Sequence, residues 1–401
     1  MPAKESQEQA AYSQATIAVH GGERPDEQPF GAVVAPVFHS TTFGFKNFAE
    51  LRRYAKGELP ESYFYSRYGN PTVAEVERKI AELEGAEDCI VTSSGSAATF
   101  CALAALCRAG DEVIACDSIY GGTVKILTGL LARFDVRSRF VTIEQIGRLP
   151  ELAGKNSKVF WFETPANPLN RLIELDHAAA MAREAGLVSI VDNTFGTPAL
   201  QKPLAHGIDA VMHSATKYLG GHSDLTAGAV AGSGYFIQRV REVSSRIGTT
   251  LDPAAAYLLA RGIKTLDVRV RAICNNALRL AEVLRNHPKV ARLYYPGLED
   301  DRDHLLAKRQ MQGFGGIVAL DLRGGEPEVE RLFDALRIVR PAPSLGGVES
   351  LVSYPLYSSH AGFSTEQLAA AGISAATVRF AVGIEAVEDL IADVLQALER
   401  V

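Results

Sequence analysis

Apolar runs of four to seven residues alternate with longer helical patterns between about residue 70 and residue 268. The apolar runs predict strands at 89–93, 111–116, 136–142, 158–163, 188–192 and 210–213, and the periodic runs predict helices at 73–84 and 97–108. Such alternation is typical of a mostly parallel sheet with helices on both faces. From about residue 269, a long helical run at 270–286 precedes shorter strands, which predicts a smaller α+β domain. Residues 1–69 show little periodicity, and we expect an extended arm that docks on a neighbouring subunit.

Lys217 lies in the run His-Ser-Ala-Thr-Lys-Tyr-Leu-Gly-Gly-His at 213–222, directly after an apolar stretch. The hydroxyls of Ser214 and Thr216 flank it, and glycines follow at once. Hydroxyl groups beside a single amine suit an anionic phosphate whose aldehyde is held as an imine, which is the chemistry of pyridoxal 5′-phosphate (PLP). A lysine becomes a nucleophile of this kind where its surroundings lower its pKa. Taken alone, the run fits a surface lysine after a buried strand equally well.

Two strand ends strengthen the PLP interpretation. Asp192 ends the apolar run at 188–192, and ligands of open α/β sheets bind at that edge. A carboxylate there would keep the pyridine nitrogen of PLP protonated. Gly95 and Ser96 lie in a small-residue turn that feeds a helix, where backbone N–H groups bind phosphate. The alternatives are a capping or solvated acid for Asp192 and an ordinary strand-to-helix turn for the glycine and serine.

Two loops supply further candidates. Tyr120 lies just past a predicted strand and would stack on the pyridine ring, unless it only anchors its loop. Asn167 lies in the Pro-bounded turn after the strand at 158–163 and would donate to the phenolic oxygen of PLP. Asparagine before proline is also ordinary turn chemistry.

These residues resemble the Cys/Met metabolism family of PLP-dependent enzymes, which includes cystathionine γ-synthase, methionine γ-lyase and the O-acylhomoserine sulfhydrylases. The matching motifs include Tyr-Ser-Arg at 65–67, Ser-Ala-Thr-Lys at 214–217 and Ser-Leu-Gly-Gly at 344–347. Further matches lie at 19–22, 94–96, 120–123, 163–168, 192–195, 261–266 and 378–385. The resemblance implies PLP-dependent fold type I (aspartate-aminotransferase-like), an α/β fold. It divides the chain into an arm (1–69), a PLP-binding domain (70–268) and a C-terminal α+β domain (269–401).

The resemblance also implies a role for each matching position. Lys217 would bind PLP as an imine and move protons between substrate carbons, with Tyr120 and Asp192 as the other catalytic residues. The phosphate would be bound by Gly95, Ser96, Ser214 and Thr216, and from the neighbouring subunit by Tyr65 and Arg67. Arg379 would bind the substrate α-carboxylate, helped by Ser344 and Asn167, with Tyr65 and Phe64 nearby. The family is expected to form homotetramers, built as dimers of dimers with shared active sites.

Three positions narrow the reaction. Relatives that handle cystathionine tend to carry an acid before Tyr-Ser-Arg, and the cystathionine γ-lyases carry another before Ser-Leu-Gly-Gly; here these positions are Phe64 and Pro343. An ammonium group entering such a pocket would lose solvation without gaining a partner. Methionine γ-lyases share the Phe64 pattern but carry a cysteine where this chain has Gly122. We therefore expect γ-replacement on an O-acylhomoserine, with sulfide or another small nucleophile.

Two alternatives stay open. One is a γ-lyase that eliminates a thiol from methionine, homocysteine or a related thioether, and the other is a non-catalytic protein with a PLP-enzyme fold. The segment at 354–363 departs from the usual family sequence and is expected to line the substrate entrance, where His360 is either a loop histidine or a group that acts on the acceptor.

Composition agrees with an enzyme that acts on small molecules. The 401 residues predict two or three domains, and 47% hydrophobic with 22% charged residues is typical of a globular protein. A net charge of −6 provides no basic face for nucleic acid, and no stretch approaches the roughly 20 apolar residues of a membrane span. The polar first residues lack the apolar core of a signal peptide. Five cysteines, at 89, 101, 107, 116 and 274, show no Cys-x-x-Cys spacing and no Cys/His cluster, so we expect a reduced, cytoplasmic protein without a metal site.

Overall fold

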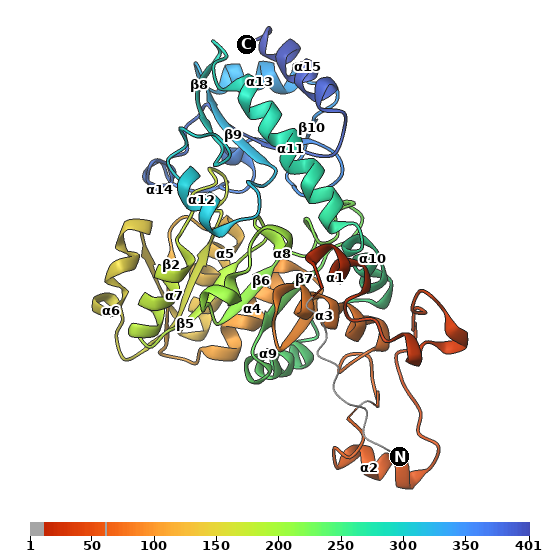
Figure 1. Ribbon diagram of the computed structural model, residues 1–401. Helices are drawn as coiled ribbons and strands as arrows, with labels where there is room; N and C mark the ends of the chain where they lie inside the picture. The colour runs from red at the N-terminus through yellow and green to blue at the C-terminus, as the bar shows by residue number, and fades with distance from the viewer. Residues whose placement is uncertain (1–11, 61) are drawn as a thin grey trace.

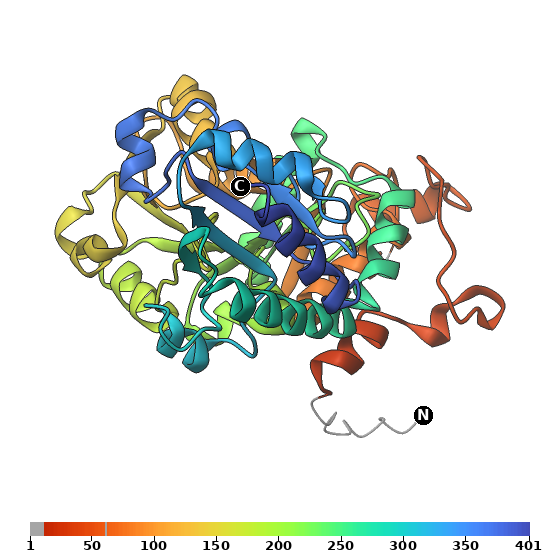
Figure 2. The ribbon, with the colours of Figure 1, turned by 90° about the horizontal axis from the view of Figure 1, so that it is seen from above.

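The computed structural model describes residues 12–60 and 62–401 of the chain. Two sheet-based units lie one above the other in Figure 1, and the long helix α11 (Leu266–Leu284) connects them. The N-terminal segment that carries α2 (Phe48–Ala55) projects away from the larger unit in both views (Figures 1 and 2). Helix α1 (Gln14–His20) instead packs against α3 (Pro71–Glu84) and α11. The first eleven residues of the predicted arm lie outside the described residues.

The larger unit is built on a seven-stranded sheet with the order β1-β7-β6-β5-β4-β2-β3. Strand β7 runs antiparallel to its neighbours β1 and β6, and the other neighbouring pairs are parallel. The mostly parallel sheet predicted from the sequence is therefore confirmed. Its strands are β1 (Asp88–Thr92), β2 (Glu112–Cys116), β3 (Arg137–Val141), β4 (Ser157–Glu163), β5 (Val188–Asp192), β6 (Ala210–His213) and β7 (Gly228–Gly232).

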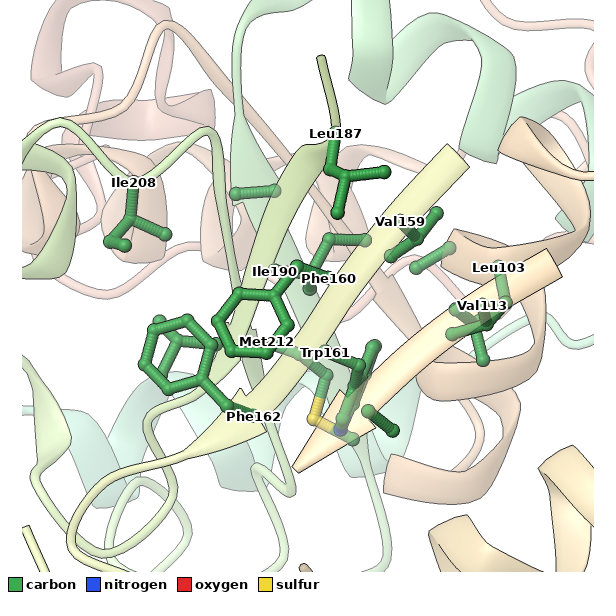
Figure 3. Packing of buried hydrophobic residues seen from close by; sticks show 14 of the residues in the cluster. Leu103, Val113, Val159, Phe160, Trp161, Phe162, Leu187, Ile190, Ile208 and Met212 are labelled. Atoms are coloured by element: carbon green, nitrogen blue, oxygen red, sulfur yellow. The ribbon is translucent and has the colours of Figure 1, made fainter. Parts of the chain in front are cut away.

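Strand β4 shows that both faces of this sheet are covered. Phe160 and Phe162 stack on one side of β4 and Trp161 points to the other (Figure 3), and all three are fully buried. Successive side chains of a strand alternate between faces, so a continuous apolar run is stable only where helices cover both sides. The helices of this unit are α3, α4 (Gly95–Leu106), α5 (Gly121–Lys125), α6 (Leu149–Leu152), α7 (Leu175–Glu184), α8 (Thr197–Leu200), α9 (Gly234–Ile247) and α10 (Pro253–Ile263).

Local sequence determines where the first two of these helices begin. Asn70 accepts a hydrogen bond from the backbone N–H of Thr72, and Pro71 occupies the first helical position of α3. Ser94 accepts from the backbone N–H of Ala97 at the start of α4. A side-chain oxygen at this place satisfies an N–H group that has no partner within the helix.

The smaller unit contains a five-stranded sheet with the order β10-β11-β12-β9-β8, in which only the β10–β11 pair is parallel. Its apolar core includes Tyr295, Val318, Leu320 and Phe380. This sheet and its helices form the predicted smaller α+β region. They are β8 (Val290–Tyr294), α12 (His304–Gln310), β9 (Ile317–Leu322), α13 (Glu326–Ala335), β10 (Arg340–Pro341), β11 (Leu351–Ser353), α14 (Thr365–Ala370), β12 (Thr377–Ala381) and α15 (Val387–Leu398).

One strand was not predicted. The run Gly-Ala-Val-Ala-Gly of β7 carries little apolar volume, so no strand was expected there. The glycine at 228 has a physical cause, because a Cβ atom there would lie 2.2 Å from the carbonyl oxygen of Ser94 at the start of α4. The long helix predicted at 270–286 begins four residues earlier, at Leu266. The predicted domain boundary at 268/269 thus falls in the first turn of α11, and the domain division stays a prediction. Within residues 12–60 and 62–401, no helix has the length and apolar character needed to cross a membrane.

Candidate active site

A cavity of about 530 Å³ opens at the carboxyl ends of β4, β5 and β6, beside the first turn of α4. Loops of the smaller unit close its other side. The structure brings most of the predicted site residues together around this cavity: Gly95, Ser96, Tyr120, Asn167, Asp192, Ser214, Thr216, Lys217, Ser344 and Arg379. Their chemistry depends on which groups already bind one another and which face the cavity.

Lys217 lies in the loop after β6, and its Nζ donates a 2.9 Å hydrogen bond to Ser344 Oγ. Burial, helped by the nearby charge of Arg379, lowers the pKa of this lysine to about 8. The pKa of an unperturbed lysine is about 10.4. The amine of Lys217 is therefore far more available as a nucleophile at neutral pH than that of a surface lysine.

The loop at 344–347 is fitted tightly against the lysine. Gly346 adopts a φ of +74°, and a Cβ atom there would lie 2.6 Å from the backbone nitrogen of Tyr218. Only glycine combines this backbone conformation with such a close approach. The Ser-Leu-Gly-Gly motif therefore places Ser344 beside Lys217.

Asp192 is the last residue of β5 and accepts hydrogen bonds from the backbone N–H and the hydroxyl of Thr194. Burial raises the pKa of Asp192, and the Thr194 hydrogen bonds and the charge of His213 oppose that rise. A buried carboxyl group at this place stays ionised more readily when a positive partner faces it from the cavity. The ring nitrogen of a pyridinium group supplies one.

Glu163 is a second buried acid, and sequence reasoning assigned it no role. It ends β4 in register with Asp192, lines the cavity, and accepts a 2.6 Å hydrogen bond from the backbone N–H of Tyr120. Burial and the neighbouring Asp192 raise its pKa well above the usual value, which favours the neutral form of this carboxyl group. The signal that identified Asp192, an acid at the end of a buried strand, applied to Glu163 as well.

The first turn of α4 lies directly against the loop after β6. A Cβ atom on Gly95 would lie 2.9 Å from Ser214 Cβ and 3.1 Å from its Cα, so the helix start and the loop after β6 approach as closely as two backbones can. The N–H groups at a helix N-terminus are suited to binding a phosphate, and phosphate binding by Gly95 and Ser96 stays a prediction. Thr216 also lines the cavity, and its hydroxyl already donates to the Ala227 carbonyl oxygen at 3.1 Å. Its part in phosphate binding stays a prediction.

Arg379 on β12 reaches the cavity from the smaller unit. Its Nη1 donates to Asn167 Oδ1 at 2.8 Å and its Nη2 to the Ser344 carbonyl oxygen at 2.9 Å. Among the described residues its buried Nε finds no hydrogen-bond partner. Burial lowers the pKa of Arg379 to about 10, which leaves it cationic near pH 7. A buried cation with a free donor is suited to a carboxylate ligand.

Tyr120 occupies the position before α5 and lines the cavity with 46% of its surface exposed. A ring presented in this way is available to stack on a planar ligand. Its neighbour Gly122 leaves room for it, because a Cβ atom there would lie 2.2 Å from the tyrosine ring.

Three predicted residues lie away from the cavity of their own chain. Arg67 donates to the Ser245 carbonyl oxygen on α9, and its guanidinium stacks 4.6 Å from the ring of Tyr68. Tyr65 lies beside it, and Phe64 packs 5.7 Å from the ring of Tyr54. Their predicted role in the site of a neighbouring subunit stays a prediction.

The segment at 354–363 does reach the cavity, through Tyr357, Ser358 and Ser359. His360 itself is a buried loop histidine that pairs with Ser359 Oγ at 2.9 Å and does not line the cavity. Burial and the charge of Arg379 lower its pKa to about 4. No group of three or more His, Cys, Asp or Glu side chains is arranged to hold a metal ion within the described part of the chain.

Comparison with known proteins shows which family and which solved structures the chain resembles. The family model described as Cys/Met metabolism PLP-dependent enzyme matches residues 15–399. An L-methionine gamma-lyase of Fusobacterium nucleatum subsp. polymorphum is 38% identical over 394 residues, which cover 97% of this chain and 99% of that protein. A cystathionine gamma-lyase of Bacillus subtilis (strain 168) is 41% identical over 387 residues, which cover 96% and 99%. The crystal structure of a cystathionine gamma synthase from Xanthomonas oryzae pv. oryzae, in complex with aminoacrylate and cysteine, has a TM-score of 0.91 and 37% identity, covering 97% of this chain and 98% of that one.

The residues around the cavity fit PLP. The N-terminus of α4 lines the cavity at Gly95 and Ser96, Lys217 presents a readily deprotonated amine, and Asp192 is a buried acid without a cationic partner in direct contact. The free Nε of Arg379 adds a site for the carboxylate of an amino acid.

Proposed function

Because the chain belongs to the Cys/Met metabolism family of PLP-dependent enzymes, we propose that it catalyses γ-replacement on an O-acylhomoserine, with sulfide or another small nucleophile as acceptor. The family carries out PLP-dependent γ-synthase and γ-lyase reactions on sulfur amino acids. The choice of donor and acceptor is specific to this proposal and is supported by the lining of the cavity.

When bound, PLP supplies an electron-withdrawing ring that stabilises negative charge on a substrate carbon. Lys217 Nζ would hold the cofactor in the resting enzyme and then take a proton from the α carbon and later one from the β carbon of the substrate, so that the γ-acyloxy group could leave as a carboxylate. The protons would be returned to the substrate after the nucleophile had added at the γ carbon. Asp192 would keep the ring nitrogen protonated, and Tyr120 would stack on the ring. Arg379 would fix the α-carboxylate through its free donors, because its other donors are held by Asn167 and Ser344.

The distribution of acids around the cavity carries the proposal. Within the described part of the chain, Glu163 and Asp192 are the only acidic residues that line it, and both lie at the strand ends. Pro343 lines the opposite side, at a position where cystathionine γ-lyases resembling this chain carry an acid. A distal ammonium such as that of cystathionine would lose its hydration there without gaining a partner. The acyl end of an O-acylhomoserine and a nucleophile such as sulfide carry no ammonium group of this kind.

Gly122 supports the same choice. Methionine γ-lyases carry cysteine at this position, and a side chain there would collide with the ring of Tyr120 in this structure. The tyrosine position observed here therefore depends on glycine. This favours replacement over methionine elimination.

Incubation with O-acetylhomoserine or O-succinylhomoserine, with and without sulfide, tests the proposal. Sulfide-dependent homocysteine with little 2-oxobutyrate is the expected product pattern. Equal 2-oxobutyrate in the presence and absence of sulfide would identify a lyase. Faster formation of cystathionine from cysteine would also overturn the proposed acceptor class.

A γ-lyase is the second candidate, because Phe64 follows the pattern of methionine γ-lyases. Release of 2-oxobutyrate from methionine or homocysteine, measured against the O-acylhomoserine reaction, ranks the two activities. The higher kcat/KM identifies the better substrate.

We also infer a shared active site between subunits. The N-terminal segment exposes large apolar side chains, among them Phe30, Val33 and Phe48, and it carries Tyr65 and Arg67 away from the cavity of its own chain. Apolar side chains of this size are stable when another surface covers them. Docking of this segment on a second copy supports the proposed homotetramer with shared sites.

A further inference from the structure

Glu84 and His213 form a buried pair directly behind the candidate active site. Glu84 Oε1 lies 2.5 Å from His213 Nε2, and both side chains are shielded from solvent. Glu84 ends α3, and His213 ends β6, so residues 129 positions apart meet at this point. Neither residue has a role in the function proposed above.

The pair lies on the face of the sheet opposite the cavity. Met212 and Ser214 line the cavity, and His213 between them does not, as expected for alternating side chains of a strand. Asn193, which follows Asp192, donates to Glu84 Oε1 at 3.3 Å. The pair is thus joined to the strand end that carries Asp192 and to the loop that carries the candidate phosphate ligand Ser214.

The charges around the pair are few. Asp192 lies close enough for a cationic His213 to oppose the burial that raises the pKa of that acid. Glu163 neighbours Asp192, and burial together with Asp192 raises the pKa of Glu163 well above its usual value, which favours its neutral form. Lys202, from the segment after α8, donates to the Leu83 carbonyl oxygen and lies near Glu84, where burial lowers its pKa and Glu84 opposes this. Cys89 faces Glu84 from β1, and burial raises the pKa of its thiol, which keeps it neutral.

We propose that Glu84 holds His213 in the cationic form, and that this buried positive charge keeps Asp192 anionic opposite the ring nitrogen of the cofactor. Both are positioning residues, since they act through Asp192 and do not touch the cavity. Glu84 is the anion that offsets the cost of a buried imidazolium, and its second oxygen, Oε2, is buried without a hydrogen-bond partner in the described structure. If the pair served only as a hydrogen bond, a neutral side chain in place of Glu84 would stabilise the fold more, because it would leave no buried carboxylate oxygen without a partner.

Because Glu84 and His213 would carry opposite charges, substitutions of the two residues test the proposal. Glu84→Gln removes the anion that holds the proton on His213, and His213→Gln removes the cation itself. Both changes make Asp192 easier to protonate, so the ring loses its own proton and withdraws fewer electrons. The nitrogen that joins Lys217 to the cofactor then keeps its proton to higher pH. Two substitutions that remove charges of opposite sign should therefore raise the same spectroscopic midpoint.

The measurement is a pH titration of the visible absorption of the PLP-loaded protein, together with the equilibrium dissociation constant for PLP. We expect a raised midpoint in both variants and about tenfold weaker PLP binding, the size of effect that partners behind a metal ligand typically have. Glu77→Gln is a matched control, since Glu77 is a buried acid of the same helix but pairs with Arg241. It should leave both quantities unchanged. Shifts in opposite directions for the two variants, or no shift in either, would overturn the proposal.

A second measurement requires no substitution. Neutron diffraction from deuterated crystals of the wild-type protein should show deuterons on both ring nitrogens of His213. A deuteron on one nitrogen only would rule out the proposed charge. The first experiment measures the absorption and binding of the cofactor, and the second locates protons in the protein. Their results therefore do not depend on whether the enzyme catalyses sulfide-dependent replacement or elimination.

Discussion

Replacement of Arg379 by lysine tests how the substrate carboxylate is bound. The guanidinium of Arg379 donates to Asn167 and to the Ser344 carbonyl oxygen, and its Nε remains without a hydrogen-bond partner among the described residues. Lysine presents its donors on a single atom, so it cannot keep both protein contacts and also bind a carboxylate through two parallel hydrogen bonds. Arg379→Lys keeps the charge and loses the planar geometry.

The expected fall in kcat/KM follows from the hydrogen bonds that the substitution removes. One hydrogen bond between charged groups contributes about 1.5–3 kcal/mol, which corresponds to a roughly 10- to 150-fold fall in kcat/KM. The retained positive charge still helps burial to keep the pKa of Lys217 at about 8. Because the carboxylate contact exists before the reaction begins, most of the fall should be a rise in KM for the O-acylhomoserine.

Steady-state kinetics at saturating sulfide, with PLP occupancy measured by absorbance, provides the assay. Arg241→Lys is the matched control, since Arg241 binds Glu77 and Asp88 away from the cavity. It should leave kcat/KM per loaded site unchanged. A kcat/KM of Arg379→Lys equal to that of the wild-type protein would refute the assignment of Arg379 to the substrate carboxylate.

Three further outcomes are expected. The rate of PLP uptake by the apoprotein should rise with pH, with its midpoint at about pH 8 and a plateau at higher pH, because only the neutral amine attacks an aldehyde and burial lowers the pKa of Lys217 to about 8. A midpoint near the pKa of a free lysine would contradict this. Gly95→Ala should weaken PLP binding by about 1–3 kcal/mol through overpacking against Ser214, whereas Gly129→Ala, with open space around it, should not. Arg67→Ala should lower PLP retention on dialysis in the assembled enzyme; a monomer with full occupancy, measured by light scattering and absorbance, would disprove the shared site.

Much of the larger sheet follows from local patterns. The runs at 188–192 and 210–213 were predicted with the observed bounds, because buried parallel strands are continuously apolar and end in polar residues. Strand β7 was missed because its residues are small, and at Gly228 the small residue is required by the close approach of α4, a contact between segments more than a hundred residues apart. No pattern of apolar and polar residues within β7 indicates this packing.

Some residues of the candidate site could be predicted from local sequence, and others could not. Asp192, Lys217 and Gly95 were predicted as site residues from strand ends and turns, whose chemistry is local, and all three line the same cavity. Glu84 was not, because in the sequence it is an ordinary acid at a helix end, and its significance depends on a fold that brings it to His213. The roles of Tyr65 and Arg67 depend on a second copy of the chain and are beyond what one chain displays.

The central claim is that Lys217 carries the cofactor. Borohydride reduction of the PLP-loaded protein, followed by proteolysis and mass mapping, tests it most directly. The account predicts a pyridoxyl label on the peptide that contains Lys217. A label on any other amine, or no label at all, would contradict it.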